Sequence, residues 1–261
     1  MKRLFMIVAA MLLMCVSTYA QKVQRQVMMV KYGNDQTFKH TIEDVKEVTF
    51  GTVVEDWEYV DLGLPSGTLW ATCNVGAEKP EDSGYFLAWG ETTPKGTYNW
   101  NTYKLCKDGS SHNLTKYCSN YYYGYNNYED NFTELLAADD AATANPDWGN
   151  EWQIASVEQF DELFSANLTT RQWTIQNGQK GMLLTSIKNG KSIFLPAVGA
   201  MNETTHGDDD ENAIYWTRSL YLDYPYSSFV LIFTSNNSFT TSLPVDRYAG
   251  LPVRAVRRYK N

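Results

Sequence analysis

Short apolar runs separated by turn-forming residues fill the second half of this chain, and they constrain its fold more than any other feature. Two pairs of such runs flank the dipeptides Asn189-Gly190 and Asn236-Asn237. Asn-Gly is the strongest short-range hairpin signal, because both residues tolerate the left-handed backbone that a tight turn needs. Further runs over 213–219 and 253–257 have the length of single strands. We therefore predict β-structure for most of residues 183–257.

Two earlier segments have helical spacing. Residues 132–142 place Phe132 and Leu135 three positions apart, with Leu136 next to them. Residues 156–166 begin with the spacing of a capping box and continue into an apolar stripe. The box is Ser156 and Gln159, and the stripe is Phe160, Leu163 and Phe164. Strands around two short helices predict an α+β domain over 53–261 with a twisted, mostly antiparallel sheet.

A smaller unit precedes this domain. Strand candidates at 27–30 and 48–50 lie on either side of a turn at 33–35. We predict a small β-rich leader module over residues 21–52.

Residues 1–20 have the layout of a secretory signal peptide. Lys2 and Arg3 are followed by an apolar stretch, and Ala20 supplies a small residue at the expected cleavage site before Gln21. The apolar stretch is about 13 residues long, whereas a spanning helix needs about 20. No later segment could span a bilayer. We predict export to the periplasm, cell surface or medium; Cys15 leaves a lipid anchor open as an alternative.

The charge balance argues against a nucleic-acid partner. The chain has 22 Lys and Arg against 30 Asp and Glu, a net charge of −8. Nucleic-acid binding depends on a basic surface that neutralises phosphates. We predict no nucleic-acid ligand.

The chain lacks the motifs of common catalytic and metal sites. It has no G-x-S-x-G, no P-loop and no Cys-x-x-Cys. Asp139 and Asp140 are adjacent, so on a helix they would project about 100° apart and could not flank one scissile bond. The acidic run at 206–212 is expected to be a solvated loop. The histidines are far apart in sequence: His40, His112 and His206. We predict no catalytic residue, metal or cofactor.

Beyond the predicted signal peptide the chain has three cysteines, Cys73, Cys106 and Cys118. The last two flank a turn-rich stretch that could fold back as a hairpin, and an oxidising compartment favours disulfides. A Cys106–Cys118 bridge is therefore a candidate, with unbridged thiols as the alternative. Cys73 lies in an apolar stretch, which favours a buried position.

The most unusual segment is 117–128, which holds six tyrosines among Asn, Ser and Gly. Tyrosine offers a flat apolar face and a hydroxyl at low entropic cost, a composition typical of binding loops. Successive side chains on an extended chain alternate in direction, so the rings at 121–123 cannot all face one core. We predict that Tyr121, Tyr122, Tyr123 and Tyr125 contact a ligand. The alternative is a loop that covers the core with its own rings.

Blocks of residues between 57 and 258 resemble a large group of exported proteins of Bacteroidetes and Fibrobacter, which carry a domain named for the Fibrobacter succinogenes major paralogous family. The resemblance covers nearly all of the main domain. The principal blocks are 59–67 (YVDLGLPSG), 70–77 (WATCNVGA), 88–95 (AWGETTPK), 148–152 (WGNEW), 194–199 (FLPAVG) and 250–254 (GLPVR). The segment Gln153-Ile-Ala-Ser156 departs from the family, which usually has a basic residue and a proline there.

The resemblance implies a C-type lectin-like fold, near the formylglycine-generating-enzyme branch, with helices near 132–144 and 156–166. The Glu-Pro-Asn or Gln-Pro-Asp triplet of calcium-dependent sugar-binding lectins does not occur. The late cysteine pair of the enzymes is also missing, since no cysteine follows Cys118.

The expected function is therefore an exported, non-enzymatic binding protein that recognises a glycan or a protein through loops of this domain. A structural or assembly component of the cell surface is the alternative. A degenerate enzyme of the same fold is the third possibility. Fold alone does not decide among them.

Overall fold

The structure, a computed structural model, divides into two compact units, residues 1–58 and 59–261. The predicted signal peptide, residues 1–20, and its cleavage site lie outside the described residues. The structure describes residues 24–31, 37–38, 47–54, 59–145, 148, 151–207 and 211–258. In the first unit the description is of the backbone alone.

The first unit contains a three-stranded antiparallel sheet in the order β2-β1-β3. β1 (Gln24–Lys31) pairs with β3 (Glu47–Val54) along its whole length, from Gln24↔Val54 to Lys31↔Glu47. β2 (Thr37–Phe38) pairs only with the end of β1. β3 therefore runs beyond residue 52, where the sequence had placed the end of the leader module, and the unit ends at Glu58.

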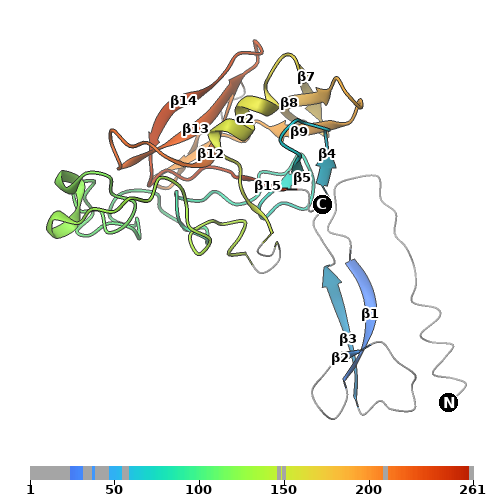
Figure 1. Ribbon diagram of the computed structural model, residues 1–261, viewed down its shortest axis with the longest axis horizontal. Helices are drawn as coiled ribbons and strands as arrows, with labels where there is room; N and C mark the ends of the chain where they lie inside the picture. Colours follow the sequence, from blue (N-terminus) through green and yellow to red (C-terminus); the bar gives the residue numbers. More distant parts are fainter. Residues whose placement is uncertain are drawn as a thin grey trace, which may run out of the picture. The chain divides into compact units, whose positions relative to one another are not determined.

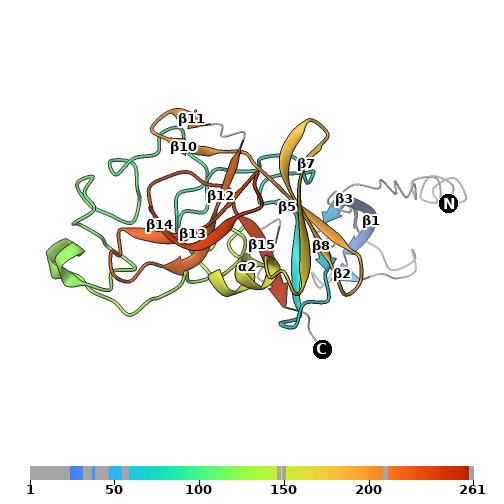
Figure 2. The same ribbon diagram turned by 90° about the horizontal axis from the view of Figure 1, so that it is seen from above.

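A four-stranded antiparallel sheet joins both ends of the second unit (Figures 1 and 2). Its order is β4-β5-β15-β6, so the strand latest in the sequence lies between two earlier ones. The strands are β4 (Tyr59–Asp61), β5 (Thr68–Asn74), β15 (Arg254–Arg258) and β6 (Gln153–Ile154). β5 is buried on both faces.

Two three-stranded antiparallel sheets and a small hairpin complete this unit. The first sheet is β7 (Thr169–Gln176), β8 (Gln179–Ser186) and β9 (Ser192–Pro196). The second is β12 (Asn212–Leu220), β13 (Ser227–Thr234) and β14 (Phe239–Asp246). The hairpin is β10 (Ala200–Asn202) and β11 (Thr205–Gly207). Both hairpins predicted at Asn189-Gly190 and Asn236-Asn237 are present, as β8–β9 and β13–β14.

The predicted α+β class with two helices is wrong, because the protein is mostly β, with 40% of residues in strands against 7% helical. Within the described residues α2 (Val157–Leu163) is the one α-helix. Of the two helices that the C-type lectin-like resemblance implies, the one near 132–144 does not form. Several separate antiparallel sheets take the place of the single twisted sheet that was expected.

The helix predicted over 132–142 does not form, because the backbone of its first part bonds to the end of β12. The amide of Leu135 donates to the carbonyl of Arg218, and the amide of Leu220 donates to the carbonyl of Thr133. These bonds hold the first part of the segment extended beside the end of β12. The second part turns around Asp140, whose side chain accepts the amides of Ala142 and Thr143. Asp side chains that bond nearby amides compete with helix formation in this way.

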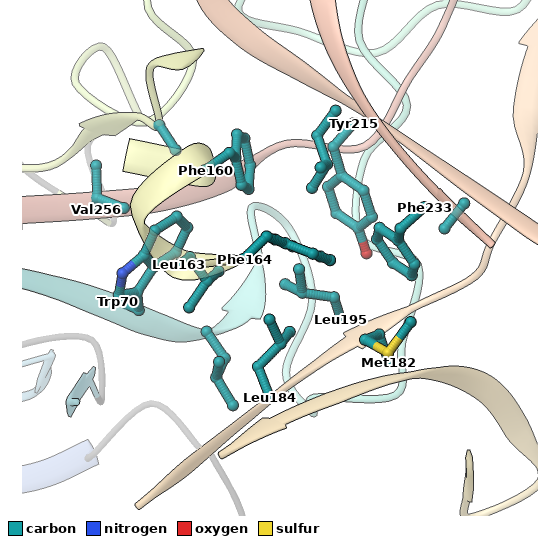
Figure 3. Close-up of a cluster of buried hydrophobic side chains, with 14 of the residues drawn as sticks. Trp70, Phe160, Leu163, Phe164, Met182, Leu184, Leu195, Tyr215, Phe233 and Val256 are labelled. Atoms are coloured by element: carbon teal, nitrogen blue, oxygen red, sulfur yellow. The ribbon is translucent and has the colours of Figure 1, made fainter. Parts of the chain in front are cut away.

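The predicted capping box is confirmed and begins α2. The hydroxyl of Ser156 accepts the amide of Gln159, and the side chain of Gln159 accepts the amide of Ser156. α2 buries Phe160 and Leu163 completely. Figure 3 shows these side chains meeting others from three sheets. Their neighbours include Trp70, Met182, Leu184, Leu195, Tyr215, Phe233 and Val256. We call this cluster the helix-side core.

A second cluster lies under the long irregular segment between β5 and β6. Its buried members are Ala88, Tyr98, Tyr103, Cys106, Leu114 and Cys118. The described residues of this segment contain no strand longer than a single bridge, and their polar groups are bonded mainly through turns. Figure 1 shows the segment at the end of the unit away from β7. We call this cluster the aromatic end.

Candidate binding surface

The segment 117–128 is the tyrosine loop, and it lies at the aromatic end (Figure 1). It contains two 3-10 turns, η2 (Tyr121–Tyr123) and η3 (Tyr125–Asn127). Asn120 caps the first turn by accepting the amide of Tyr122 at 3.0 Å. Asn126 and Asn127 have φ of 53° and 59°, a left-handed conformation that asparagine tolerates well. The sequence did not predict these turns.

Three of the four predicted contact residues are exposed. Tyr121 and Tyr122 are 61% and 65% exposed, and Tyr125 is 38% exposed. Tyr123 is half-buried, with its ring 5.2 Å from that of Tyr226. The loop thus turns Tyr121 and Tyr122 outward and uses Tyr123 to pack inward. Contact between these rings and a ligand stays a prediction.

The loop is fastened at its centre by Leu114, which is completely buried. The amide of Leu114 donates to the carbonyl of Tyr123, and its carbonyl accepts the amide of Tyr125, both at 2.8 Å. Gly124 lies between these bonds. A Cβ at position 124 would lie 1.8 Å from the carbonyl oxygen of Tyr128, so only glycine fits there. The exposed rings are therefore held on a fixed backbone.

Asp130 fastens both ends of the loop. Its carboxylate accepts the amides of Tyr117 and Cys118, at 2.7 and 3.1 Å. It also accepts the hydroxyl of Tyr128 at 2.9 Å. Burial, together with this hydrogen bond and the Asp130 charge, raises the pKa of Tyr128 to about 12. One side chain thus joins the first and last turns of the loop.

A second tyrosine turn, residues 221–226, packs against the loop from about a hundred positions away in the sequence. The ring of Tyr123 lies 5.2 Å from Tyr226 and 6.5 Å from Tyr224. The hydroxyl of Ser119 donates to the carbonyl of Leu222 at 2.7 Å. Leu222 and Tyr224 are 48% and 47% exposed. The motif Tyr221-Leu-Asp-Tyr-Pro-Tyr226 is visible in the sequence, but its proximity to the loop is not.

Together the two segments form what we call the tyrosine face. It consists of Tyr121, Tyr122, Tyr123, Tyr125, Leu222, Tyr224 and Tyr226. His112 extends it, with its ring 5.3 Å from Tyr122 and 5.1 Å from Tyr123. Most of the rings meet edge to face or tilted, the geometry that aromatic pairs prefer.

The structure does not join the proposed disulfide partners, Cys106 and Cys118. The thiol of Cys106 points to the carbonyls of Trp100 and Tyr103, and that of Cys118 to the carbonyl of Asn120. Burial raises the pKa of both thiols, which disfavours the reactive thiolate. The two residues border Leu114 and the loop, but each sulfur is directed to its own turn. Cys73 is buried, as predicted.

Asp139 and Asp140 each accept hydrogen bonds from groups within the fold. Asp139 accepts bonds from the Lys116 ammonium and the Tyr117 hydroxyl. Asp140 is buried and accepts three backbone amides. Within the described ranges, no group of three or more His, Cys, Asp or Glu side chains could hold a metal ion. Residues 208–210 of the acidic run lie outside those ranges.

A shallow hollow of about 230 Å³ lies elsewhere, beside the helix-side core. Apolar side chains such as Leu64, Leu168 and Ile187 line it together with the polar residues Asn167, Ser186 and Lys188. The Lys188 ammonium donates to the carbonyl of Gly63. Its lining offers few groups that could specify a ligand. In the part of the chain that the structure describes, no helix is long and apolar enough to cross a membrane.

Comparison of the chain with family models, curated proteins and solved structures finds no match in any of the three. The functional proposal below therefore depends on the residues themselves.

Proposed function

We propose that this is an exported, non-enzymatic binding protein that recognises a glycan or a protein through the tyrosine face. The observation that carries the proposal is the combination of exposed rings and a fixed backbone at Tyr121 and Tyr122. Export rests on the layout of residues 1–20. The likeness to an exported paralogous group supports the same conclusion.

Exposed rings on a fastened loop need an explanation other than folding. A ring left in water gives up the burial free energy of about 25 cal/mol per Å² that it would gain in a core. Clusters of such rings often mark binding surfaces. A backbone that is already ordered also reduces the entropy lost on binding. The anchors at Leu114, Gly124 and Asp130 supply this order.

Single-ring variants test the proposal. Tyr122→Ser should abolish most ligand capture on a glycan array or in a pull-down, because it removes the most exposed ring of the loop. Tyr85→Ser is the matched control, because Tyr85 is 40% exposed but belongs to neither tyrosine segment. Equal capture by the wild type and Tyr122→Ser, for every ligand bound, would exclude the tyrosine face as the site.

One observation favours a second function, an assembly component that acts through the first unit. In the described residues β1 is covered by β2 only at Val30 and Lys31, and β3 pairs only with β1. Open strand edges can accept a strand from another chain. Sedimentation of the full chain would then show a dimer or larger species that Val27→Pro disperses. A monomer at all concentrations would exclude this route.

A further inference from the structure

The tyrosine face has two arms, and a buried arginine holds them together. Arg247 is completely buried. One nitrogen of its guanidinium, Nη1, donates to the carbonyl of Tyr117 at 2.8 Å and to that of Pro225 at 2.7 Å. Tyr117 opens the tyrosine loop, and Pro225 lies between Tyr224 and Tyr226 in the second turn. A single planar group therefore binds both arms.

The rest of the guanidinium is also engaged. Nη2 donates to the carbonyl of Lys116 at 3.1 Å, and Nε donates to the Tyr103 hydroxyl at 2.8 Å. The cation lies 5.2 Å from the ring centres of both Trp89 and Tyr103. The rigid fork of arginine can hold several acceptors in fixed directions, which the point charge of lysine cannot. Ser119 adds a second link at the surface, through its bond to Leu222.

The size of the face limits what it can bind. A fully exposed tyrosine offers about 200 Å², so the exposed fractions of Tyr121, Tyr122, Tyr125 and Tyr224 amount to on the order of 400 Å². A standard protein interface needs about 800 Å² on each partner. These four rings alone cover about half of such an interface, an area that a narrow ligand, such as a chain of sugar residues, can occupy in full.

The charges beside the face select among narrow ligands. Glu129 and Asp223 are exposed directly next to the two arms. The nearby Lys116 ammonium is already bound to Asp139, and the Arg247 cation is buried. Like charges across an interface are unfavourable, so an anionic ligand is disfavoured. The ring faces and hydroxyls, with the exposed amides of Asn120, Asn126 and Asn127, match the apolar faces and hydroxyls of neutral sugars.

We infer that the ligand of the tyrosine face is a neutral polysaccharide chain that lies across both arms. Arg247 holds the two arms in a fixed position relative to each other. This inference rests on the proposed function and narrows it to one ligand class. It also adds Tyr224 to the contact residues and makes Arg247 a positioning residue that does not touch the ligand.

Affinity electrophoresis of the full chain tests the ligand class. The gels contain neutral polysaccharides (β-glucan, xylan and mannan) or acidic ones (polygalacturonate and alginate). At least one neutral polymer should retard the wild type, and the acidic ones should not. Tyr122→Ala and Tyr224→Ala should each weaken the retardation at least tenfold, whereas the control Tyr85→Ala should not. Retardation by acidic polymers alone, or unchanged binding by Tyr224→Ala, would overturn the inference.

The test separates this inference from the broader proposal. Tyr122-dependent capture of a protein, with no polysaccharide retarding the chain, would refute the glycan ligand and leave the binding function standing. No Tyr122-dependent binding of any kind would refute both.

The role of Arg247 has its own test. Arg247→Lys should weaken retardation by the neutral polymer at least tenfold. Adding Tyr224→Ala to this variant should weaken retardation little further, because the second arm has already lost its position beside the first. Such non-additivity separates positioning from a general loss of stability. Should Arg247→Lys fail to fold, Ser119→Ala removes the surface link alone and should weaken binding relative to the control Ser242→Ala. Additive effects, and unchanged binding by Ser119→Ala, would refute the coupling of the arms.

Discussion

The helix-side core and the aromatic end are built in different ways within one unit. In the first, apolar side chains from α2 and from strands of three sheets pack around Phe160, and the Tyr215 hydroxyl donates to the carbonyl of Pro196. In the second, irregular backbone is held by buried polar groups such as Arg247 and by the carboxylates of Asp130 and Asp140. Where a backbone group of a loop finds no backbone partner, a side chain has to supply one. The difference teaches that regular sheets carry the apolar packing, while polar anchors shape the proposed binding surface.

The largest effect is expected in the helix-side core. Phe160→Ala should lower the free energy of unfolding by about 3–5 kcal/mol, since it empties the centre of a tightly packed cluster. Its ring lies 5.3 Å from Trp70 and is completely buried. Urea denaturation followed by fluorescence would measure the loss. A loss below about 1 kcal/mol would mean that this core is loosely packed.

Asp130→Ala should have a smaller and more local effect. It leaves the amides of Tyr117 and Cys118 and the Tyr128 hydroxyl without their acceptor, at a cost of about 1–3 kcal/mol. Hydrogen exchange should rise at the tyrosine loop and stay unchanged in α2. Faster exchange throughout the unit would show that the two regions unfold together.

The Asp140 carboxyl should make the stability of the second unit sensitive to pH. Burial raises its pKa above the ordinary value of 3.8. The folded state therefore holds this proton more tightly than the unfolded chain does, so its contribution to stability is full below the unfolded pKa and is lost as pH rises through the folded pKa. Carboxyl NMR shifts should show a midpoint above 3.8. The stability difference between wild type and Asp140→Asn should become less favourable to the wild type as pH rises through that window; a pH-independent difference would contradict the shift.

Surface rings of the tyrosine face should matter little for stability. Tyr121→Ser should change the free energy of unfolding by no more than about 0.5 kcal/mol, because the ring is largely in water. Tyr123→Ser, which removes a ring that packs on Tyr226, is the contrasting variant and should cost more. Thermal unfolding of both would measure the contrast. Equal losses would show that the whole loop serves packing.

The smallest effect is expected from reductant. Because Cys106 and Cys118 are not joined, dithiothreitol should leave the melting temperature unchanged, whereas a bridge closing so short a loop would contribute about 2–3 kcal/mol. Alkylation of the unfolded chain followed by peptide mapping should modify both residues. A pair of peptides that is linked only in the absence of reductant would show that the Cys106–Cys118 disulfide forms.

Local signals in the sequence predicted local structure well. The capping box at Ser156 and the turn at Asn189-Gly190 each involve residues a few positions apart, so their geometry follows from the chain itself. The helix prediction for 132–142 was wrong, because bonds to β12 and to the side chain of Asp140 outweigh the helical spacing of its apolar residues. The bonding groups of β12 are distant in sequence, and Asp140 acts through a single side chain. The spacing of apolar residues therefore does not reveal either interaction.

The candidate site was predictable only in part. Alternation and composition predicted that at least one ring of 121–123 faces solvent. They did not predict that the neighbours Tyr121 and Tyr122 both do so, because the segment forms a 3-10 turn and is not extended. The second arm at 221–226 did not follow from them, because nothing in the sequence indicates that Tyr226 packs on Tyr123. The role of Arg247 was equally hidden, since its partners are backbone carbonyls, which any residue supplies.

The position of β15 between β5 and β6 has a consequence for the order of folding. Neither neighbour can complete its ladder until the residues beyond Val253 have been synthesised, since Val256 pairs with both Trp70 and Gln153. During synthesis, the apolar edge of β5 stays unpaired until β15, about 180 positions later, has been made. Pairings of such sequence separation form slowly and leave strand edges open to other chains. The four-stranded sheet should therefore form only after synthesis has passed β15, and the chain should need protection from aggregation until then.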